Sequence, residues 1–136
     1  MPARSDGDAT RHAVALGDLL PRLRRGPRPE AGPVRSHLAD GTVVWLAGMD
    51  RDAGVVLDAE LADQAVPERL RAAYGDEDFW RRWTGMECAV KATDGSVGSW
   101  LRAHGLEVPA AAGIELVTHE VDDGLDRWVV SLGRRP

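Results

Sequence analysis

Three acidic side chains and one lysine have the types and the spacing that chemistry requires. Asp58 and Glu60 are two residues apart in a run of strand character, and Glu87 precedes Lys91 by four residues. Carboxylate oxygens suit Mg²⁺, which also keeps positions for water and for the phosphate oxygens of a substrate. An ammonium group beside such an ion would neutralise charge that builds up on a phosphate during transfer. We therefore expect a magnesium site used for phosphate chemistry.

Lys91 is the only lysine among the 17 basic residues. A preference for Arg, Ala, Gly, Asp and Val is typical of a GC-rich coding sequence, and it explains most of the missing lysines but not the one retained. One alternative is a surface pair with Glu87, which at this spacing stabilises a helix by about 0.2 to 0.5 kcal/mol. Because arginine would serve such a pair equally well, the lysine favours a role for a compact ammonium group.

The segment GVVLDAEL, residues 54–61, is predicted to be the strand that positions the first two acids. Alternation along a strand puts Asp58 and Glu60 on one face, roughly 6.6 Å apart, with Val56 beside them. The opposite face carries the apolar residues Val55, Leu57, Ala59 and Leu61. Since exposed acids are the rule, a solvated strand face is the alternative to a cation site.

A helix over residues 78–93 is predicted to position the other two side chains. Apolar residues recur along it at spacings of four, three and four: Phe79, Trp83, Met86 and Val90. This stripe is expected to bury one side of the helix, with Glu87 and Lys91 on its shoulder.

The remaining segments complete an α+β prediction. Residues 1–9 are expected to form a flexible tail and residues 10–136 a single domain. Periodicity and turn signals predict a helix within 9–20, an extended connection over 21–37, a strand at 42–48, short helices at 66–75 and 96–105, a loop at 106–113, and a hairpin over 113–133 that turns at 122–124. We expect helices packed on one face of a mainly antiparallel sheet.

The composition weighs against several classes of function. A formal charge of -5 and a pI of about 5.3 weigh against nucleic acid as the partner, because binding to the phosphate backbone needs a basic surface. No run approaches the roughly 20 apolar residues of a membrane span, and the N-terminus lacks the apolar core of a secretion signal. A single cysteine, Cys88, fits a reducing cytoplasm and is expected to be a buried structural thiol.

Taken together, these segments resemble a known family. Asp-Ala-Glu at 58–60 and Trp-Thr-Gly-Met-Glu-Cys-Ala-Val-Lys-Ala at 83–92 are similar to the signatures of the 4'-phosphopantetheinyl transferases of the surfactin-synthetase-activating type. Ser36-His37 resembles the upstream Ser-His segment of that family, and Gly26-Pro27-Arg28-Pro29 resembles the Gly-x-Pro stretch before it. The likeness runs in order over roughly residues 10–133, and it implies a phosphopantetheinyl-transferase-like half-domain.

The resemblance implies Mg²⁺-dependent transfer of 4'-phosphopantetheine from coenzyme A to a serine of an acyl or peptidyl carrier protein. Asp58, Glu60 and Glu87 would hold Mg²⁺ against the coenzyme A pyrophosphate. Glu87, or a water on the ion, would take the proton of the serine. Lys91 would stabilise the departing adenosine 3',5'-bisphosphate.

Further contacts to coenzyme A are implied near the beginning of the chain. His37, with Ser36 beside it, would contact a coenzyme phosphate. Arg28 belongs to a basic cluster that is either a solvated connector or a contact for coenzyme phosphates or an acidic carrier protein: Arg22, Arg24, Arg25 and Arg28. The other histidines show no metal-ligand spacing and are expected at the surface or in packing: His12, His104 and His119.

Departures from the family keep a second hypothesis open. Members of this type carry two similar halves, whereas 35 residues precede Ser36 here, and the usual Gly-x-Gly after Lys91 is absent. A homodimer or homotrimer would restore the missing half, as in the single-half chains of the fatty-acid-synthase class. The alternative function is a divergent member without transferase activity, which binds a carrier protein or catalyses another reaction in a biosynthetic pathway.

Overall fold

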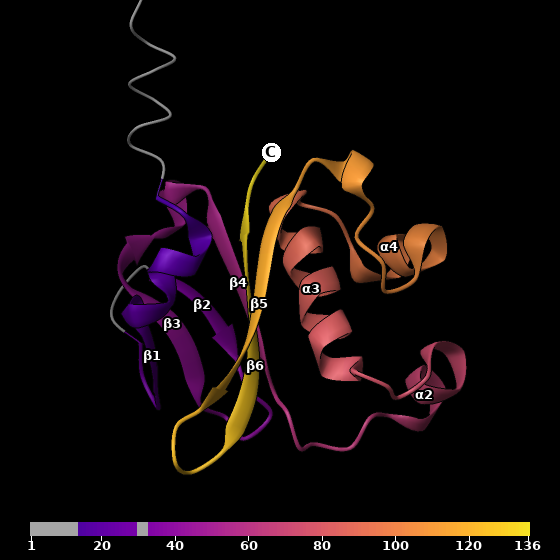
Figure 1. Cartoon of the computed structure of the whole chain (residues 1–136), viewed down its shortest axis with the longest axis horizontal. Coiled ribbons are helices and arrows are strands. Elements are labelled where there is room, and N and C mark those ends of the chain that lie inside the picture. Colours follow the sequence, from indigo (N-terminus) through magenta and orange to yellow (C-terminus); the bar gives the residue numbers. More distant parts are fainter. Residues whose placement is uncertain (1–13, 30–32) are drawn as a thin grey trace, which may run out of the picture.

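Two three-stranded antiparallel sheets lie face to face, and α-helices cover the outer face of one of them (Figure 1). The computed structural model describes residues 14–29 and 33–136. The predicted α+β class is confirmed, but two sheets replace the single sheet that was expected.

The two sheets also contact each other through a pair of edge strands. The first sheet has the order β1-β3-β2, with β1 at Leu23–Gly26, β3 at Val43–Asp50 and β2 at Pro33–His37. The second has the order β4-β6-β5, with β4 at Val55–Leu61, β6 at Arg127–Arg134 and β5 at Glu115–Asp122. Edge strand β2 contacts edge strand β4, so side chains of the first sheet reach the strand that carries the predicted acids.

The α-helices form an outer layer on the second sheet (Figure 1): α2 at Glu68–Tyr74, α3 at Phe79–Ala92 and α4 at Val97–His104. The described part of the chain also has three short 3₁₀ helices, η1 at Leu16–Arg22, η2 at Arg51–Ala53 and η3 at Ala110–Ala112. Of these, η1 contributes Leu16 and Leu19 to the core between the sheets. Helix α3 lies directly on the second sheet, and α2 and α4 lie on its far side (Figure 1). None of the helices in the described part of the chain is long and apolar enough to cross a membrane.

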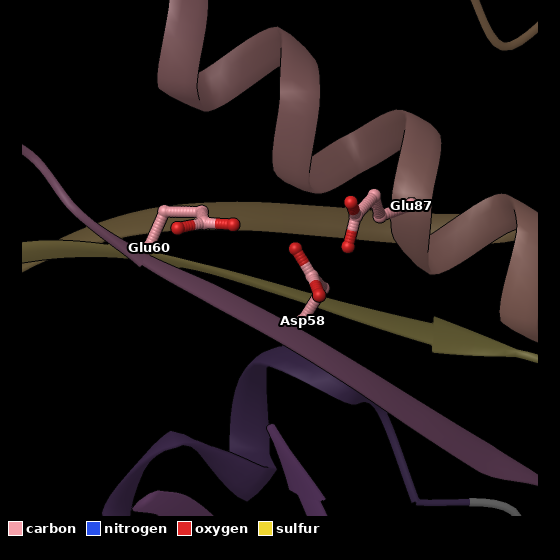
Figure 2. A group of neighbouring side chains, drawn as sticks. All are labelled: Asp58, Glu60 and Glu87. Carbon is pink, nitrogen blue, oxygen red and sulfur yellow. The ribbon is translucent and has the colours of Figure 1, made fainter. Parts of the chain in front are cut away.

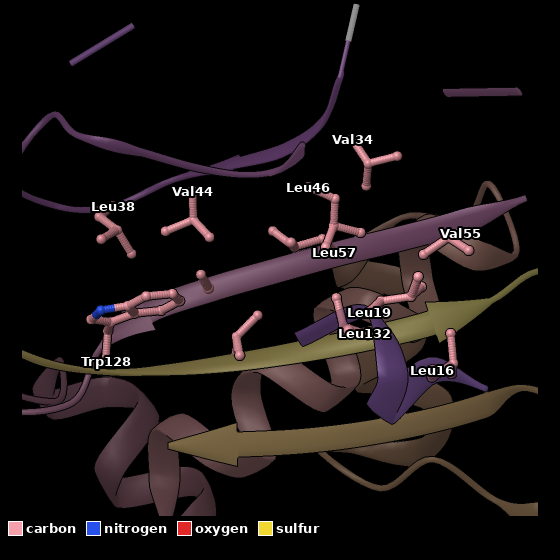
Figure 3. Close-up of a cluster of buried hydrophobic side chains, with 12 residues drawn as sticks. Leu16, Leu19, Val34, Leu38, Val44, Leu46, Val55, Leu57, Trp128 and Leu132 are labelled. Carbon is pink, nitrogen blue, oxygen red and sulfur yellow. The ribbon is translucent and has the colours of Figure 1, made fainter. Parts of the chain in front are cut away.

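Apolar side chains form three clusters. The main core fills the space between the sheets and includes the following residues (Figure 3): Leu16, Leu19, Val34, Leu38, Val44, Leu46, Val55, Leu57, Ala59, Trp128, Val130 and Leu132. A second cluster joins α3 to α2 and α4 and contains the predicted stripe of Phe79, Trp83, Met86 and Val90. A third, smaller cluster lies between α3 and the sheet, around Val56, Cys88 and Ala92. The bulky stripe of α3 therefore faces away from the sheet.

Helix α3 approaches the sheet closely because the residues between them are small. A Cβ added to Gly133 of β6 would lie 2.9 Å from Cys88 Sγ, closer than real Cβ contacts come. Thr84 and Cys88 are both fully buried on α3, and Cys88 Sγ lies 3.6 Å from the carbonyl oxygen of Ser131. Cys88 is thus the buried structural thiol that was predicted. This close approach carries the neighbouring residues Glu87 and Lys91 toward β4.

Most of the predicted elements after residue 40 are present, with ends displaced by a few residues. The predicted strands at 42–48 and 54–61 are β3 and β4, and the predicted helices at 66–75, 78–93 and 96–105 are α2, α3 and α4. The hairpin predicted over 113–133 is formed by β5 and β6, and the predicted loop before it contains η3.

Among the described residues before position 40, the predicted elements were largely wrong. The connection expected over 21–37 contains β1 and β2, because its prolines lie where strands tolerate them: Pro27 and Pro29 follow β1, and Pro33 is the first residue of β2. The helix expected within 9–20 is a 3₁₀ helix that continues through Pro21. The tail predicted over 1–9 lies outside the described residues.

Arg25 belongs to the predicted basic cluster and joins the two sheets. Its guanidinium forms ion pairs with Asp40 at 2.6 Å, with Asp123 at 2.8 Å and with Asp126 at 2.9 Å. Asp40 belongs to the turn before β3, whereas the other two acids belong to the turn between β5 and β6. Arg25 therefore has a structural role in joining the two sheets, and the part that the basic cluster plays in binding stays a prediction.

Candidate metal centre

Asp58 is a buried acid in the middle of β4, with 2% of its surface exposed. Both faces of the strand are covered: Leu57 and Ala59 point into the core between the sheets, and Val56 packs against α3. The predicted alternation along the strand is confirmed. The alternative of a solvated strand face is wrong for Asp58, because α3 covers the face on which it lies.

Glu60 and Glu87 approach Asp58 from two different elements. Each of the three residues offers one carboxylate oxygen, and these oxygens all lie within 4.8 Å of one another. Figure 2 shows Asp58 and Glu60 rising from β4 and Glu87 reaching toward them from α3. Both glutamates are half-buried. The three acids, two from β4 and one from α3, therefore form one cluster in a largely covered place.

Glu60 is held by a residue that follows β4. Gln64 Nε2 donates a hydrogen bond to Glu60 Oε2 at 2.9 Å. The backbone carbonyl oxygen of Gln64 in turn accepts a hydrogen bond from Trp80 Nε1 at 3.0 Å. This chain of contacts links the carboxylate of Glu60 to the first turn of α3.

Lys91 lies beside the cluster and binds β4. Its ammonium donates to the carbonyl oxygen of Leu57 at 2.7 Å and to Asp58 Oδ1 at 3.2 Å. Among the described residues its ion-pair partner is Asp58 and not Glu87. The surface pair considered for Glu87 and Lys91 is therefore not formed. An ammonium has three donors, and with 37% of its side chain exposed Lys91 also reaches solvent.

Ser36 reaches the same carboxylate from the opposite sheet. The residue is 6% exposed, and its Oγ accepts a hydrogen bond from the backbone N–H of Ala59 at 3.2 Å. The hydroxyl donates toward Asp58 Oδ1 at 3.4 Å. Strand β2 thus contributes a polar side chain to a cluster otherwise built from β4 and α3.

The surroundings raise the pKa of two of the acids. For Asp58, burial raises the pKa well above its ordinary value; Lys91 opposes this shift, while the charge and hydrogen bonding of Glu87 and the charge of Glu60 add to it. For Glu60, burial again raises the pKa, the hydrogen bond from Gln64 lowers it, and Glu87 raises it. Carboxylates packed this closely can all stay ionised only if a cation lies among them. Without one, they hold a proton between them.

The cluster fits a hard divalent cation. Asp58 Oδ2 is buried and has no hydrogen-bond donor among the described residues, so an acceptor in a covered place lacks a partner. The three residues offer only oxygen ligands, which is the donor set that Mg²⁺ prefers while keeping waters. Asp58, Glu60 and Glu87 are the residues that would hold the ion, and Lys91 limits the net negative charge around it.

A pocket of about 580 Å³ adjoins the cluster at Lys91 and Leu57. Its polar lining is mainly cationic or hydrogen-bonding: Arg35, His37, Lys91 and Arg135, with Asp94 the acid among them. Asp94 Oδ1 forms an ion pair with Arg135 at 3.0 Å. A pocket with this lining, next to a cation site, suits an anionic ligand such as a phosphate.

The predicted coenzyme contacts lie in different places. His37 is exposed and lines the pocket beside Lys91. Ser36, its neighbour, is buried and faces Asp58 instead. Arg28 is exposed just after β1, and among the described residues it does not line this pocket.

Three residues of the site were missed by sequence reasoning. Gln64 was not noticed because a glutamine after a strand carries no motif. Arg35 lies in the segment that was predicted to be a connection, and Arg135 follows the predicted hairpin. They line one pocket only because the tertiary structure brings β2 and the residue after β6 to the same place. The alternation of buried and exposed residues along β2 is the one signal that pairs Arg35 with His37.

Comparison with known proteins assigns this chain to no family. No protein-family model, no curated protein and no solved structure matches the chain. The function of the cluster and of the adjoining pocket therefore has to be inferred from the residues themselves.

Proposed function

We propose that this protein transfers 4'-phosphopantetheine from coenzyme A to a serine of an acyl or peptidyl carrier protein, with Mg²⁺ held by Asp58, Glu60 and Glu87. The observation that carries the proposal is the convergence of these three carboxylates, from β4 and α3, within 4.8 Å. The ammonium of Lys91 and a pocket whose polar lining includes Arg35, His37 and Arg135 adjoin them and support it. The fold then corresponds to a phosphopantetheinyl-transferase-like half-domain.

The reaction joins the carrier serine oxygen to the phosphorus that bears pantetheine. The bond from that phosphorus to the second phosphate of coenzyme A breaks, and adenosine 3',5'-bisphosphate leaves. Mg²⁺ supplies charge neutralisation to the pyrophosphate when it is bound. Glu87, on the helix side of the cluster, accepts the proton that the serine hydroxyl loses.

Lys91 and the pocket act on the leaving group. The ammonium of Lys91 donates to the phosphate oxygens on which negative charge grows as the bond breaks. Arg35, His37 and Arg135, on the pocket wall, bind the remaining phosphates of the coenzyme. The buried position of Asp58 keeps bulk water away from one side of the cluster.

One observation favours the second candidate function, a carrier-binding protein or repurposed enzyme of the same fold. Lys91 already donates to Leu57 and Asp58 within the protein. An ammonium committed to these two acceptors serves stability, and a chain that had lost coenzyme A chemistry would still retain it for this reason.

Mass spectrometry of a carrier protein separates the two candidates. The protein is incubated with Mg²⁺, coenzyme A and an apo carrier protein, and the transferase proposal expects the carrier to gain the mass of one phosphopantetheine group. Chelation of Mg²⁺ and the substitution Glu87→Gln are expected to abolish the gain. The matched control Glu120→Gln alters an exposed acid of β5, and with this variant the carrier should still gain the mass of the group. An unmodified carrier, under conditions in which a known transferase modifies it, would contradict the proposal.

A further inference from the structure

We infer that Ser36 is a positioning residue, whose buried hydroxyl orients Asp58 so that Oδ2 rather than Oδ1 faces the bound cation. The inference rests on the metal site of the proposed function, but not on the identity of the substrate. It assigns Ser36 a role different from the contact with coenzyme phosphate that the sequence suggested.

The hydrogen bonds of Ser36 have a defined direction. Its Oγ accepts from the backbone N–H of Ala59 at 3.2 Å, so the hydroxyl proton is left to point elsewhere. The acceptor within reach is Asp58 Oδ1 at 3.4 Å. This distance is longer than the usual 2.7–2.8 Å of an O–H···O bond, but burial strengthens a polar contact because water does not compete for it.

Two donors converge on the same oxygen of Asp58. Lys91 Nζ donates to Asp58 Oδ1 at 3.2 Å, and the hydroxyl of Ser36 donates to the same oxygen. A carboxylate without such partners presents either oxygen to a ligand, since rotation about its last bond exchanges them. With both donors on Oδ1, the oxygen without a donor among the described residues is Oδ2. Figure 2 shows one oxygen of Asp58 directed toward the space between the two glutamates.

The packing of the two sheets makes this contact possible. Ser36 belongs to β2, in the first sheet, whereas Asp58 belongs to β4, at the edge of the second. Alternation along β2 buries Ser36 against β4 and exposes His37 toward the pocket. Residues that orient metal ligands in this way typically contribute 10- to 100-fold to metal affinity.

Binding of Mn²⁺ alone, measured by electron paramagnetic resonance on the full chain, tests the inference. Ser36→Ala is expected to raise the dissociation constant about tenfold, at the lower end of that range because the contact to Oδ1 is long. Mg²⁺ should displace the bound Mn²⁺ from the wild-type protein.

Ser131→Ala is the matched control. Ser131 is also a fully buried serine, and it is paired with Asp58 across the β4–β6 ladder. Its hydroxyl, however, bonds to Thr84 and Thr118 rather than to an acid. Ser131→Ala is therefore expected to lower the melting temperature of the metal-free protein while leaving the dissociation constant for Mn²⁺ within about twofold of the wild-type value.

Three results would overturn the inference: an unchanged dissociation constant in Ser36→Ala, an equal loss of affinity in both alanine variants, or no binding of Mn²⁺ by the wild-type protein. If Ser36→Ala does not fold, Ser36→Cys decides in its place, because the thiol keeps the volume and donates only weakly. The proposed function fails separately: weaker Mn²⁺ binding by Ser36→Ala, together with a wild-type protein that leaves the carrier unmodified, supports the role of Ser36 and contradicts the transfer.

Discussion

Lys91 Nζ lies 3.2 Å from Asp58 Oδ1 and 2.7 Å from the carbonyl oxygen of Leu57, so one side chain of α3 both neutralises a buried acid and binds the edge strand β4. A compact ammonium makes both contacts at neighbouring points of one strand, for which the planar fork of arginine is less suited. This relationship gives the only lysine of the chain a structural reason to be present, beside the chemical one that we propose.

The charge of Lys91 is expected to stabilise the fold. Lys91→Met leaves Asp58 buried without its counter-charge. Breaking a fully buried pair costs about 3 to 5 kcal/mol, and because Lys91 is 37% exposed we expect a loss of about 2 kcal/mol in the free energy of unfolding. Urea denaturation measures it. Asp58→Asn in the Lys91→Met background should recover part of the loss, whereas strictly additive effects would show that the pair is not coupled.

Transfer is expected to depend on Lys91 more steeply than stability does. Removing one donor that stabilises growing charge typically lowers the rate about 100- to 1,000-fold, and Lys91→Met should slow phosphopantetheine transfer by that order at temperatures where the variant is folded. Lys91→Arg keeps the charge and serves as the control. A rate that falls only in proportion to the folded fraction would make Lys91 a structural residue alone.

Glu87→Gln is expected to weaken metal binding and to stabilise the metal-free protein. The substitution removes one of three carboxylates whose oxygens lie within 4.8 Å. Repulsion between two unit charges at 4.8 Å is about 3.5 kcal/mol at an effective dielectric constant of about 20. Melting curves recorded in a chelator measure the stability of the metal-free protein. The rise in melting temperature when Mg²⁺ replaces the chelator measures metal binding. A lower melting temperature in the chelator would show that Glu87 stabilises the fold through a proton shared with Asp58.

The Arg25 network is expected to make stability depend on pH in acid. Asp123 accepts hydrogen bonds from the backbone N–H of Asp126, from Arg25 and from the backbone N–H of Leu125, and these hold its pKa below the ordinary value of 3.8. Because the pKa is lowered in the folded state, the stabilisation is fully present above 3.8 and is lost as the pH falls below that value.

Asp123→Asn tests this dependence. The wild-type protein should exceed the variant in melting temperature by a constant margin down to about pH 5, and the margin should shrink as the pH falls to about 2. A margin that does not change with pH would show that the hydrogen bonds of the turn, and not the charge of Asp123, supply the stability.

Gly133→Ala is expected to force α3 away from the sheet. The added methyl group would lie 2.9 Å from Cys88 Sγ, and Val56 and Leu116 are also within 3.3 Å. Overpacking of this kind costs about 1 to 3 kcal/mol. Cys88→Ala removes the nearest atom, so the double variant should lose less stability than the sum of the two single variants. Denaturation of all three variants provides the comparison, and a sum without such coupling would contradict the close approach.

Much of the second half of the fold was predictable because its signals are local. The periodicity of residues 78–93 and the alternation in 54–61 depend on neighbouring residues, and both elements formed as predicted. The segment over 21–37 was misread because its prolines and glycines indicate a loop unless a partner strand is present. Strand β3 supplies the hydrogen bonds on which β1 and β2 depend.

By itself, the sequence determined which side chains share a face: Asp58 and Glu60 along one strand, and Glu87 and Lys91 one turn apart on a helix. These relationships follow from the repeat of a strand and of a helix, and they need no other part of the chain. Only the tertiary structure decided that the two pairs meet, that Lys91 bonds to Asp58 rather than to Glu87, and that Ser36 completes the cluster. The physical reason is that α3 packs closely over small residues while β2 packs against the edge of β4, and such distances between elements depend on the packing of the whole core.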